Sequence, residues 1–192
     1  MSLDRLVREV RTCTACADLP LGPRPVLQIA QSARLLIVGQ APGRKVHETG
    51  VPWNDGSGER LRQWMEIDRT VFYDERRVAI VPVGLCYPGR DPAGGDRPPR
   101  RECAPLWHAR LVGQLGDIRL TLLVGSHAQR LHLGAAGKAT MTETVRASRQ
   151  YAPRFLPLPH PSWRSAIWMR RNPWFEAVSL PELRRAVRTA LD

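Results

Sequence analysis

Four cysteines are the first residues of this chain that could do chemistry together. Cys13 and Cys16 form a C-x-x-C pair, and Cys86 and Cys103 follow much later in the chain. By itself such a pair is redox-active, half of a metal site or a chance occurrence. Zinc more often uses two short-spaced pairs, whereas an iron–sulfur cluster accepts thiolates that are widely spread. The spacing favours a metal site of some kind over four unliganded thiols.

His160 and Trp53 are single residues whose surroundings indicate chemistry. His160 follows a short apolar run and precedes a proline, which places its imidazole in a turn after a strand. An imidazole held there can donate a hydrogen bond to a developing negative charge. Trp53 stands among turn residues, a context that suits a ring stacking on a ligand. The alternative for both is an ordinary packing role, which is the commoner one for a lone histidine or tryptophan.

The charge balance indicates a polyanionic partner. The chain has 29 Lys+Arg against 18 Asp+Glu, and only Lys45 and Lys138 are lysines. The planar guanidinium of arginine suits phosphates and base edges. Coding bias in a GC-rich genome can explain the ratio of arginine to lysine but not the excess of basic over acidic residues. We therefore expect nucleic acid as the partner, with the arginine-rich loop 90–101 as one phosphate-binding edge.

The segment 163–175 mixes arginines with aromatic residues. Loops of this composition hold kinked DNA by inserting an apolar wedge and contacting phosphates. The alternative is a helix whose aromatic side chains pack in the core. We expect both roles, with Trp174 and Phe175 buried and with Trp163 and Arg164 facing the nucleic acid.

The elements that must position these residues alternate between strands and helices. Apolar runs predict strands at 33–39, 78–85, 119–125 and 155–159. Apolar residues at helical spacing predict helices at 2–13, 59–65, 102–115, 127–133 and 176–191. Pro82 places the second strand at a sheet edge or marks a bulge. The pattern predicts a three-layer α/β/α fold with a mainly parallel central sheet, formed by residues 1–192 as one domain.

The order of these elements predicts where a site lies. In folds of this class, ligands bind at the carboxyl ends of the parallel strands. The loops 39–43, 86–101 and 160–174 all follow predicted strands, so we expect them to converge. No apolar run approaches the ~18 residues of a membrane span. The first residues lack the apolar region of a signal peptide. We expect a cytoplasmic monomer that does not bind membranes.

Taken together, the motifs resemble those of the uracil-DNA glycosylase superfamily, most closely its iron–sulfur, family 4-like branch. Gly39-Gln40-Ala41-Pro42-Gly43 resembles the first motif, which holds the water and the flipped base. Thr49-Gly50-Val51-Pro52-Trp53 is similar to the segment whose aromatic ring stacks on the base. His160-Pro161-Ser162 resembles the second motif, which supplies an electrophilic histidine and a loop that enters the minor groove. The order of the cysteines is similar to that of the cluster ligands.

The chain departs from the pattern of that branch at three positions. Gln40 stands where an acidic residue is usual, Ala41 where other branches have a water-activating aspartate, and Pro82 where an asparagine reads the base. Only Asn54 and Asn172 are asparagines, so Asn54, the backbone or another residue must read the base. The candidates for orienting water are the Gln40 side chain, the backbone around Ala41, and the carboxylates of Glu48 and Asp55.

The resemblance implies a DNA repair enzyme that flips out a deaminated base, uracil in the first instance, and hydrolyses its N-glycosidic bond. It implies a [4Fe-4S] cluster on the four cysteines, with zinc as the alternative, and DNA contacts by Ser162, Trp163, Arg164 and Arg171. No lysine lies in a matching motif, so lyase chemistry through a Schiff base is disfavoured. The alternatives are a glycosylase for another base such as hypoxanthine, and a non-catalytic iron–sulfur protein that binds DNA.

Overall fold

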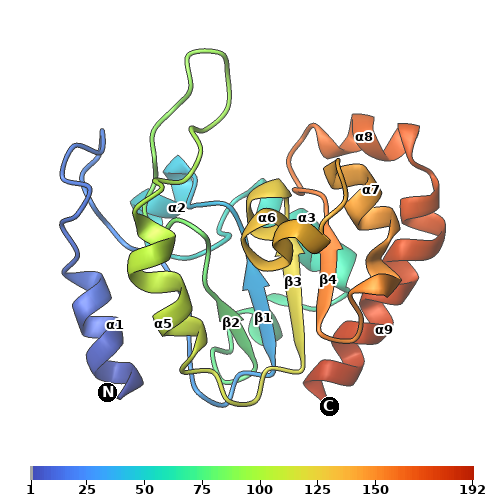
Figure 1. The fold of residues 1–192 in the computed structure, drawn as a ribbon, viewed down its shortest axis with the longest axis horizontal. Helices are drawn as coiled ribbons and strands as arrows, with labels where there is room; N and C mark the ends of the chain where they lie inside the picture. Colours follow the sequence, from blue (N-terminus) through green and yellow to red (C-terminus); the bar gives the residue numbers. More distant parts are fainter. Residues whose placement is uncertain (1) are drawn as a thin grey trace.

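The computed structural model describes residues 2–192 and is built on one parallel sheet (Figure 1). Its four strands lie in the order β2-β1-β3-β4, and each pairs in parallel with its neighbours. The strands are β1 Leu35–Val38, β2 Val78–Ile80, β3 Leu120–Val124 and β4 Phe155–Leu158. The four predicted strands are therefore confirmed, each shorter at one or both ends than the apolar run that predicted it.

Helices cover both faces of the sheet, because successive residues of each strand point to opposite sides. Leu36 and Val38 pack against one set of helices, and Leu35 and Ile37 pack against the other. The first set is α1 Leu3–Arg11, the π-helical η1 Ala104–His108, α5 Ala109–Val112 and α6 Ser126–Leu133. The second set is α3 Gly56–Met65, α4 Arg69–Phe72, α7 Met141–Arg146, η4 Phe175–Ser179 and α9 Leu180–Leu191. The fold is the predicted three-layer α/β/α arrangement.

Pro82 explains where β2 ends. The strand stops at Ile80, and it forms one edge of the sheet, as the proline predicted. The other edge strand, β4, contains Pro157, which an edge position also tolerates. The segments after β2 and β4 are thus free to leave the sheet and form long loops.

Three short helices were not predicted from the sequence: α2 Arg44–Thr49, α4 Arg69–Phe72 and α7 Met141–Arg146. A further short helix, α8 Ser165–Arg171, lies in the segment 163–175, where a helix was one of the two expected roles. Each is too short to display a clear helical period of apolar residues. Local caps begin two of them: Asp68 accepts from the Val71 amide, and Thr140 and Glu143 form a capping box.

The expectation that Trp174 is buried was wrong, whereas Phe175 is fully buried as expected. Trp174 is only partly buried, and the Arg146 guanidinium covers its ring at 4.9 Å from the ring centre. Its Nε1 donates to the Asn172 side-chain oxygen at 3.2 Å. None of the helices in residues 2–192 is long and apolar enough to cross a membrane.

Candidate active site

A pocket of about 550 Å³ opens at the carboxyl edge of the sheet. This volume is in the range typical of ligand sites. The loops after β1, β2 and β4 all contribute to its wall, so the predicted convergence is confirmed. In Figure 1 the loop between β2 and η1, drawn in green, projects beyond this edge of the sheet. Among the residues that line the pocket are Gly39, Gln40, Ala41, Pro42, Gly43, Trp53, Asp55, Arg90, Asp96, His160, Ser162, Trp163 and Arg164.

Trp53 and His160 lie next to each other in this pocket. Their ring centroids are 5.7 Å apart and the ring planes are inclined by 32°. They come from segments more than 100 residues apart in the chain, the loop before α3 and the turn after β4. The pair offers a flat ring for stacking and an imidazole for hydrogen bonding on neighbouring parts of one wall.

The Trp53 ring is seated on Gly39, at the end of β1. A Cβ atom at residue 39 would lie 2.8 Å from Trp53 Cζ2, closer than such atoms approach in proteins. Trp53 also has a φ of 55°, in the left-handed region that bulky side chains rarely adopt. Backbone strain of this kind persists only where surrounding contacts hold it, and it gathers at functional sites.

The surroundings of His160 favour the neutral form of its imidazole. Burial lowers its pKa from the ordinary value, and the nearby Asp55 carboxylate opposes that effect in part. The turn that carries it is closed by the Ser162 amide, which donates to the His160 carbonyl at 2.9 Å. Behind it, a Cβ atom at Gly125 would lie 3.4 Å from His160 Cβ, so the side chain packs closely on the end of β3.

Two carboxylates face the pocket, from Asp55 and Asp96. Asp55 begins α3 as its N-cap, and its Oδ1 accepts from the Gly58 amide at 2.8 Å. Asp96 lies on the projecting loop and hydrogen bonds with Tyr87. Burial raises the pKa of Asp96, and the negative charge of Asp55 raises it further. Each carboxylate thus increases the negative potential at the other.

Most of the predicted site residues lie in the pocket wall, but Glu48, Asn54 and Arg171 do not. Glu48 is exposed on α2 and pairs with Arg44, with 2.9 Å between Nε and Oε1. It does not line the pocket, since α2 turns it outward, and this position does not favour it among the candidates for orienting water. Asn54 lines a separate hollow between α3 and α4 rather than the pocket. Gln40 does line it, and its side-chain amide donates to the Arg97 carbonyl at 3.1 Å, which ties down the projecting loop.

The mouth of the pocket carries an exposed aromatic ring and a guanidinium. Trp163 is 69% exposed, and Arg164 lies over its ring at 5.1 Å. Arg164 also faces the tip of the projecting loop, where a Cβ atom at Gly94 would lie 3.7 Å from its Nη2. Arg171 is exposed at the end of α8 and lies outside the pocket wall.

Sequence reasoning missed Asp96 and did not single out Arg90 as part of the pocket. Both belong to the loop after β2, which was predicted to converge on the site. Their position after a buried strand was the available signal. The high proline and glycine content of this loop gave no periodicity from which to infer the direction of any side chain.

The four cysteines line one separate cavity and form no disulfide. Burial raises the pKa of Cys86 to about 12 and that of Cys103 to about 11, so both are thiols unless a cation binds them. In residues 2–192, no three His, Cys, Asp or Glu side chains are placed to hold a single metal ion.

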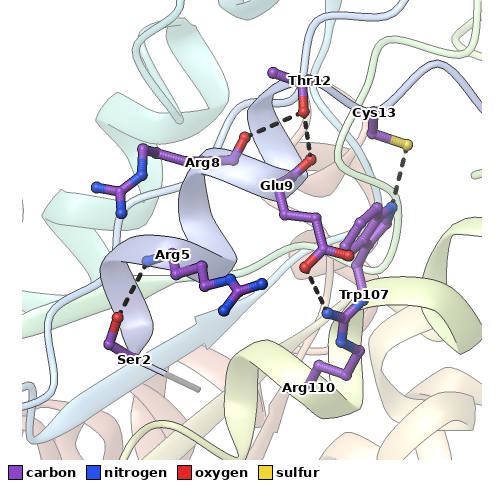
Figure 2. Close-up of polar contacts among 8 residues, drawn as sticks. All are labelled: Ser2, Arg5, Arg8, Glu9, Thr12, Cys13, Trp107 and Arg110. Atoms are coloured by element: carbon purple, nitrogen blue, oxygen red, sulfur yellow. Dashed lines mark hydrogen bonds and ion pairs between the residues drawn. The ribbon is translucent and has the colours of Figure 1, made fainter.

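Polar contacts hold the N-terminal segment against the helix that follows Cys103. Trp107 Nε1 donates to the Cys13 sulfur at 3.2 Å, and Arg110 pairs with Glu9 at 2.7 Å (Figure 2). The Leu85 amide donates to the Cys103 sulfur at 3.2 Å. These contacts bring the C-x-x-C pair and the two later cysteines to the same cavity.

The comparison with protein families decides the family of this chain. The family described as "Uracil DNA glycosylase superfamily" matches residues 27–184, a span that contains the whole pocket wall apart from Val26. The chain belongs to this superfamily. At this level it is a DNA N-glycosylase with DNA as its partner.

This superfamily member is also similar to a solved structure. It is a solution NMR structure of a candidate uracil DNA glycosylase from Methanosarcina acetivorans. The sequences are 16% identical, and the match covers 82% of this chain and 93% of the other with a TM-score of 0.42. The superfamily assignment rests on the family match and not on this similarity.

Proposed function

We propose that this chain is a monofunctional DNA glycosylase that flips uracil out of DNA and hydrolyses its N-glycosidic bond. The observation that carries the proposal is the Trp53–His160 pair inside a pocket whose mouth presents Trp163 and Arg164. An enzyme that acts on a base in DNA must extrude it, stack it and stabilise the charges that form as the bond breaks. The pocket offers a group for each of these tasks.

Capture of the base is assigned to the pocket mouth and to Trp53. The exposed Trp163 ring is suited to enter the space that the flipped base leaves, and Arg164 beside it is suited to contact a phosphate. Inside the pocket, the Trp53 ring is held rigidly on Gly39 and offers its free surface to the base. Stacking on an aromatic ring contributes about 1–3 kcal/mol per base.

His160 stabilises the leaving base. As the N-glycosidic bond breaks, negative charge develops on the base oxygens, and a neutral imidazole can donate to one of them. Because burial lowers its pKa, His160 remains neutral at the pH of a cell. It therefore acts as a positioned hydrogen-bond donor rather than as a cation, and it needs no change of protonation to do so.

Asp55 is assigned to the sugar side of the bond. The position usual for a water-activating aspartate holds Ala41, whereas the Asp55 carboxylate faces the same pocket. A carboxylate there stabilises the positive sugar in the transition state and orients the attacking water. Since one oxygen of Asp55 accepts from the Gly58 amide, the orientation of the carboxylate is set by the first turn of α3.

Hydrolysis, rather than attack by an amine, follows from the composition of the pocket wall. No lysine is among the described residues that line it, and Lys45 lies instead at the hollow that contains Asn54. A Schiff-base mechanism needs such an amine next to the sugar. Water is therefore the nucleophile in this proposal.

We also propose that the four cysteines hold a [4Fe-4S] cluster. Support comes from one cavity lined by four free thiols and from the amide and indole N–H groups that donate to two of the sulfurs. Hydrogen bonds to ligating sulfurs are typical of such sites. When bound, the cluster would supply a brace between the N-terminal segment and the loop 86–103, and no redox step is needed for base excision.

The test is release of free base from oligonucleotides under single-turnover conditions. We expect uracil to be released from a duplex or single strand that contains one uracil, while a matched thymine strand is left intact. The same oligonucleotides with hypoxanthine at that position separate the uracil enzyme from a glycosylase for another base. Binding of every oligonucleotide without release of any base would contradict the proposed activity and leave a DNA-binding protein.

A further inference from the structure

We infer that Arg62 is a positioning residue for base capture, which it serves by holding the Trp53 backbone from beneath the pocket. The inference rests on the proposed function, since it assigns a task to the Trp53 ring. Arg62 does not line the pocket that contains His160, and it belongs to none of the sequence motifs. It lies on the inner side of α3, where it is 8% exposed.

Arg62 contacts the Trp53 carbonyl and the Tyr73 hydroxyl, the two groups that hold the turn at Trp53. Its Nη1 donates to the Trp53 carbonyl and to the Tyr73 hydroxyl, each at 3.4 Å. The Tyr73 hydroxyl in turn donates to the Pro52 carbonyl at 3.1 Å. Two consecutive carbonyls, those of Pro52 and Trp53, are thus held by one connected set of donors. These two carbonyls lie on either side of the Cα atom of Trp53, the residue whose φ is 55°.

The buried guanidinium is stabilised by rings rather than by a carboxylate. It lies 5.2 Å from the centre of the Phe72 ring and 5.8 Å from that of Tyr73. Arg62 forms none of the ion pairs found within residues 2–192. A buried cation is costly unless its donors are used, and aromatic faces offset part of that cost. The Trp53 carbonyl is one of the few acceptors that this guanidinium has.

Close packing at Gly58 fixes the position of the Trp53 carbonyl. A Cβ atom at residue 58 would lie 1.8 Å from the Trp53 carbonyl oxygen, so the carbonyl sits directly on the first turn of α3. The ring of the same residue sits on Gly39, at the end of β1. Trp53 is therefore fixed at its ring by the sheet and at its carbonyl by α3 and Arg62. Loss of the guanidinium leaves the contacts of the ring with Gly39 and of the carbonyl with α3 in place, and removes the hydrogen bond to the carbonyl.

A double-mutant cycle tests whether Arg62 acts through Trp53. Arg62→Met keeps a long apolar stem and removes the donors. We expect it to lower the single-turnover ratio of maximal rate to half-saturating enzyme concentration by about tenfold, within the range that loss of stacking gives. In a Trp53→Ala background the same change is expected to cost less than about twofold, because coupled residues are not additive. Equal losses in both backgrounds would overturn the inference.

Arg69→Met is the matched control. Arg69 also lies over the Tyr73 ring, at 5.1 Å, but it is exposed and makes no hydrogen bond to the Trp53 turn. We expect this variant to retain wild-type excision. Tyr73→Phe is a second, milder probe, because it keeps the ring and removes the donor to Pro52. We expect this variant to lower the single-turnover ratio less than Arg62→Met does, and to lower it less again in the Trp53→Ala background. It tests the inference even if Arg62→Met does not fold.

A readout independent of activity separates this inference from the proposed function. The chain has six tryptophans, so protein labelled with 5-fluorotryptophan gives a small set of ¹⁹F signals, and Trp53→Phe identifies one of them. Arg62→Met is expected to shift or broaden the Trp53 signal, whereas Arg69→Met leaves it in place. If no base is excised by wild-type protein, the proposed function fails and this measurement still stands. An unchanged Trp53 signal in Arg62→Met would refute the positioning role whatever the activity.

Discussion

The carboxylates of Asp55 and Asp96 approach Gly43 from two different loops. A Cβ atom at residue 43 would lie 3.4 Å from Asp96 Oδ2 and 3.8 Å from Asp55 Oδ2. Gly43 is also the N-cap of α2 and forms part of the first motif. The pocket wall has Ala41 where an aspartate is usual, but it carries the carboxylates of Asp55 and Asp96 instead. The two carboxylates have roles that can be tested separately.

Asp55→Asn is expected to lower the single-turnover rate of excision by about 10²-fold or more, the size of loss seen for one electrostatic group in a transition state. Asparagine is as good an N-cap as aspartate, so α3 should keep its stability. Rates measured with a uracil oligonucleotide check the first point, and thermal unfolding checks the second. Glu48→Gln is the control, because Glu48 is exposed on α2, and it should excise at the wild-type rate.

Asp96→Asn is expected to stabilise the fold at neutral pH. Burial and the charge of Asp55 raise the pKa of Asp96, so its contribution to stability is greatest below its unfolded pKa and is lost as the pH rises through the raised value. The amide mimics the neutral carboxyl group at every pH. Urea unfolding should therefore show a higher free energy for the variant at pH 7 and a shrinking difference toward pH 4. Asp117→Asn, at an aspartate outside the pocket wall, serves as the comparison, and a destabilised Asp96→Asn at pH 7 would contradict this account.

His160→Ala is expected to reduce the excision rate by about 10²–10³-fold, the usual loss for one donor to a developing oxyanion. Affinity for uracil-free duplex should barely change, because the imidazole acts on the flipped base. Since burial lowers the pKa of His160, protonation should not reduce the wild-type rate between pH 8 and the ordinary histidine range near 6.5. His127→Ala, on α6 outside the pocket wall, is the control. Wild-type excision by His160→Ala would show that the motif is wrongly assigned.

Arg164→Ala is expected to weaken duplex binding and to reduce the slope of log affinity against log salt by about one unit, since one phosphate contact is lost. Titrations between low and moderate salt measure that slope. Arg5→Ala is a charge-matched control, because Arg5 is exposed on α1, on the opposite side of the molecule from α8 in Figure 1. An identical effect of both changes would mean that only net charge matters.

Protein purified without oxygen is expected to be brown and to contain iron and sulfide in equal amounts if the cysteines bind the proposed cluster. Cys86→Ser should lose most of the iron, because Cys86 is one of the four thiols lining the cavity. Colourless protein with one zinc would contradict the cluster while keeping a metal site. Colourless protein without metal would contradict both.

The core and the location of the site could be predicted from the sequence because both depend on local information. Runs such as Leu35–Val38 are apolar without interruption, which is enough to predict a strand covered on both faces. Parallel strands end at one edge, so the order of strands and loops placed Gly39 and His160 near one another in advance. Trp53 lies outside those loops, and only the resemblance of its segment to a superfamily motif indicated its place beside the base. The motif segments themselves carry the resemblance to the superfamily that the family match confirms.

The direction of individual side chains was decided only by tertiary structure. Glu48 and Asp55 are both acidic residues near the motif, yet the six-residue helix α2 turns Glu48 to solvent, while the cap of α3 turns Asp55 into the pocket. Asp96 enters the site from a loop without any periodic pattern. In the sequence, Arg62 is an unremarked arginine on an amphipathic helix. Arg62 reaches the Trp53 carbonyl because Gly39 and Gly58, which have no side chains, allow the sheet and α3 to pack directly against Trp53. No local sequence pattern predicts that packing.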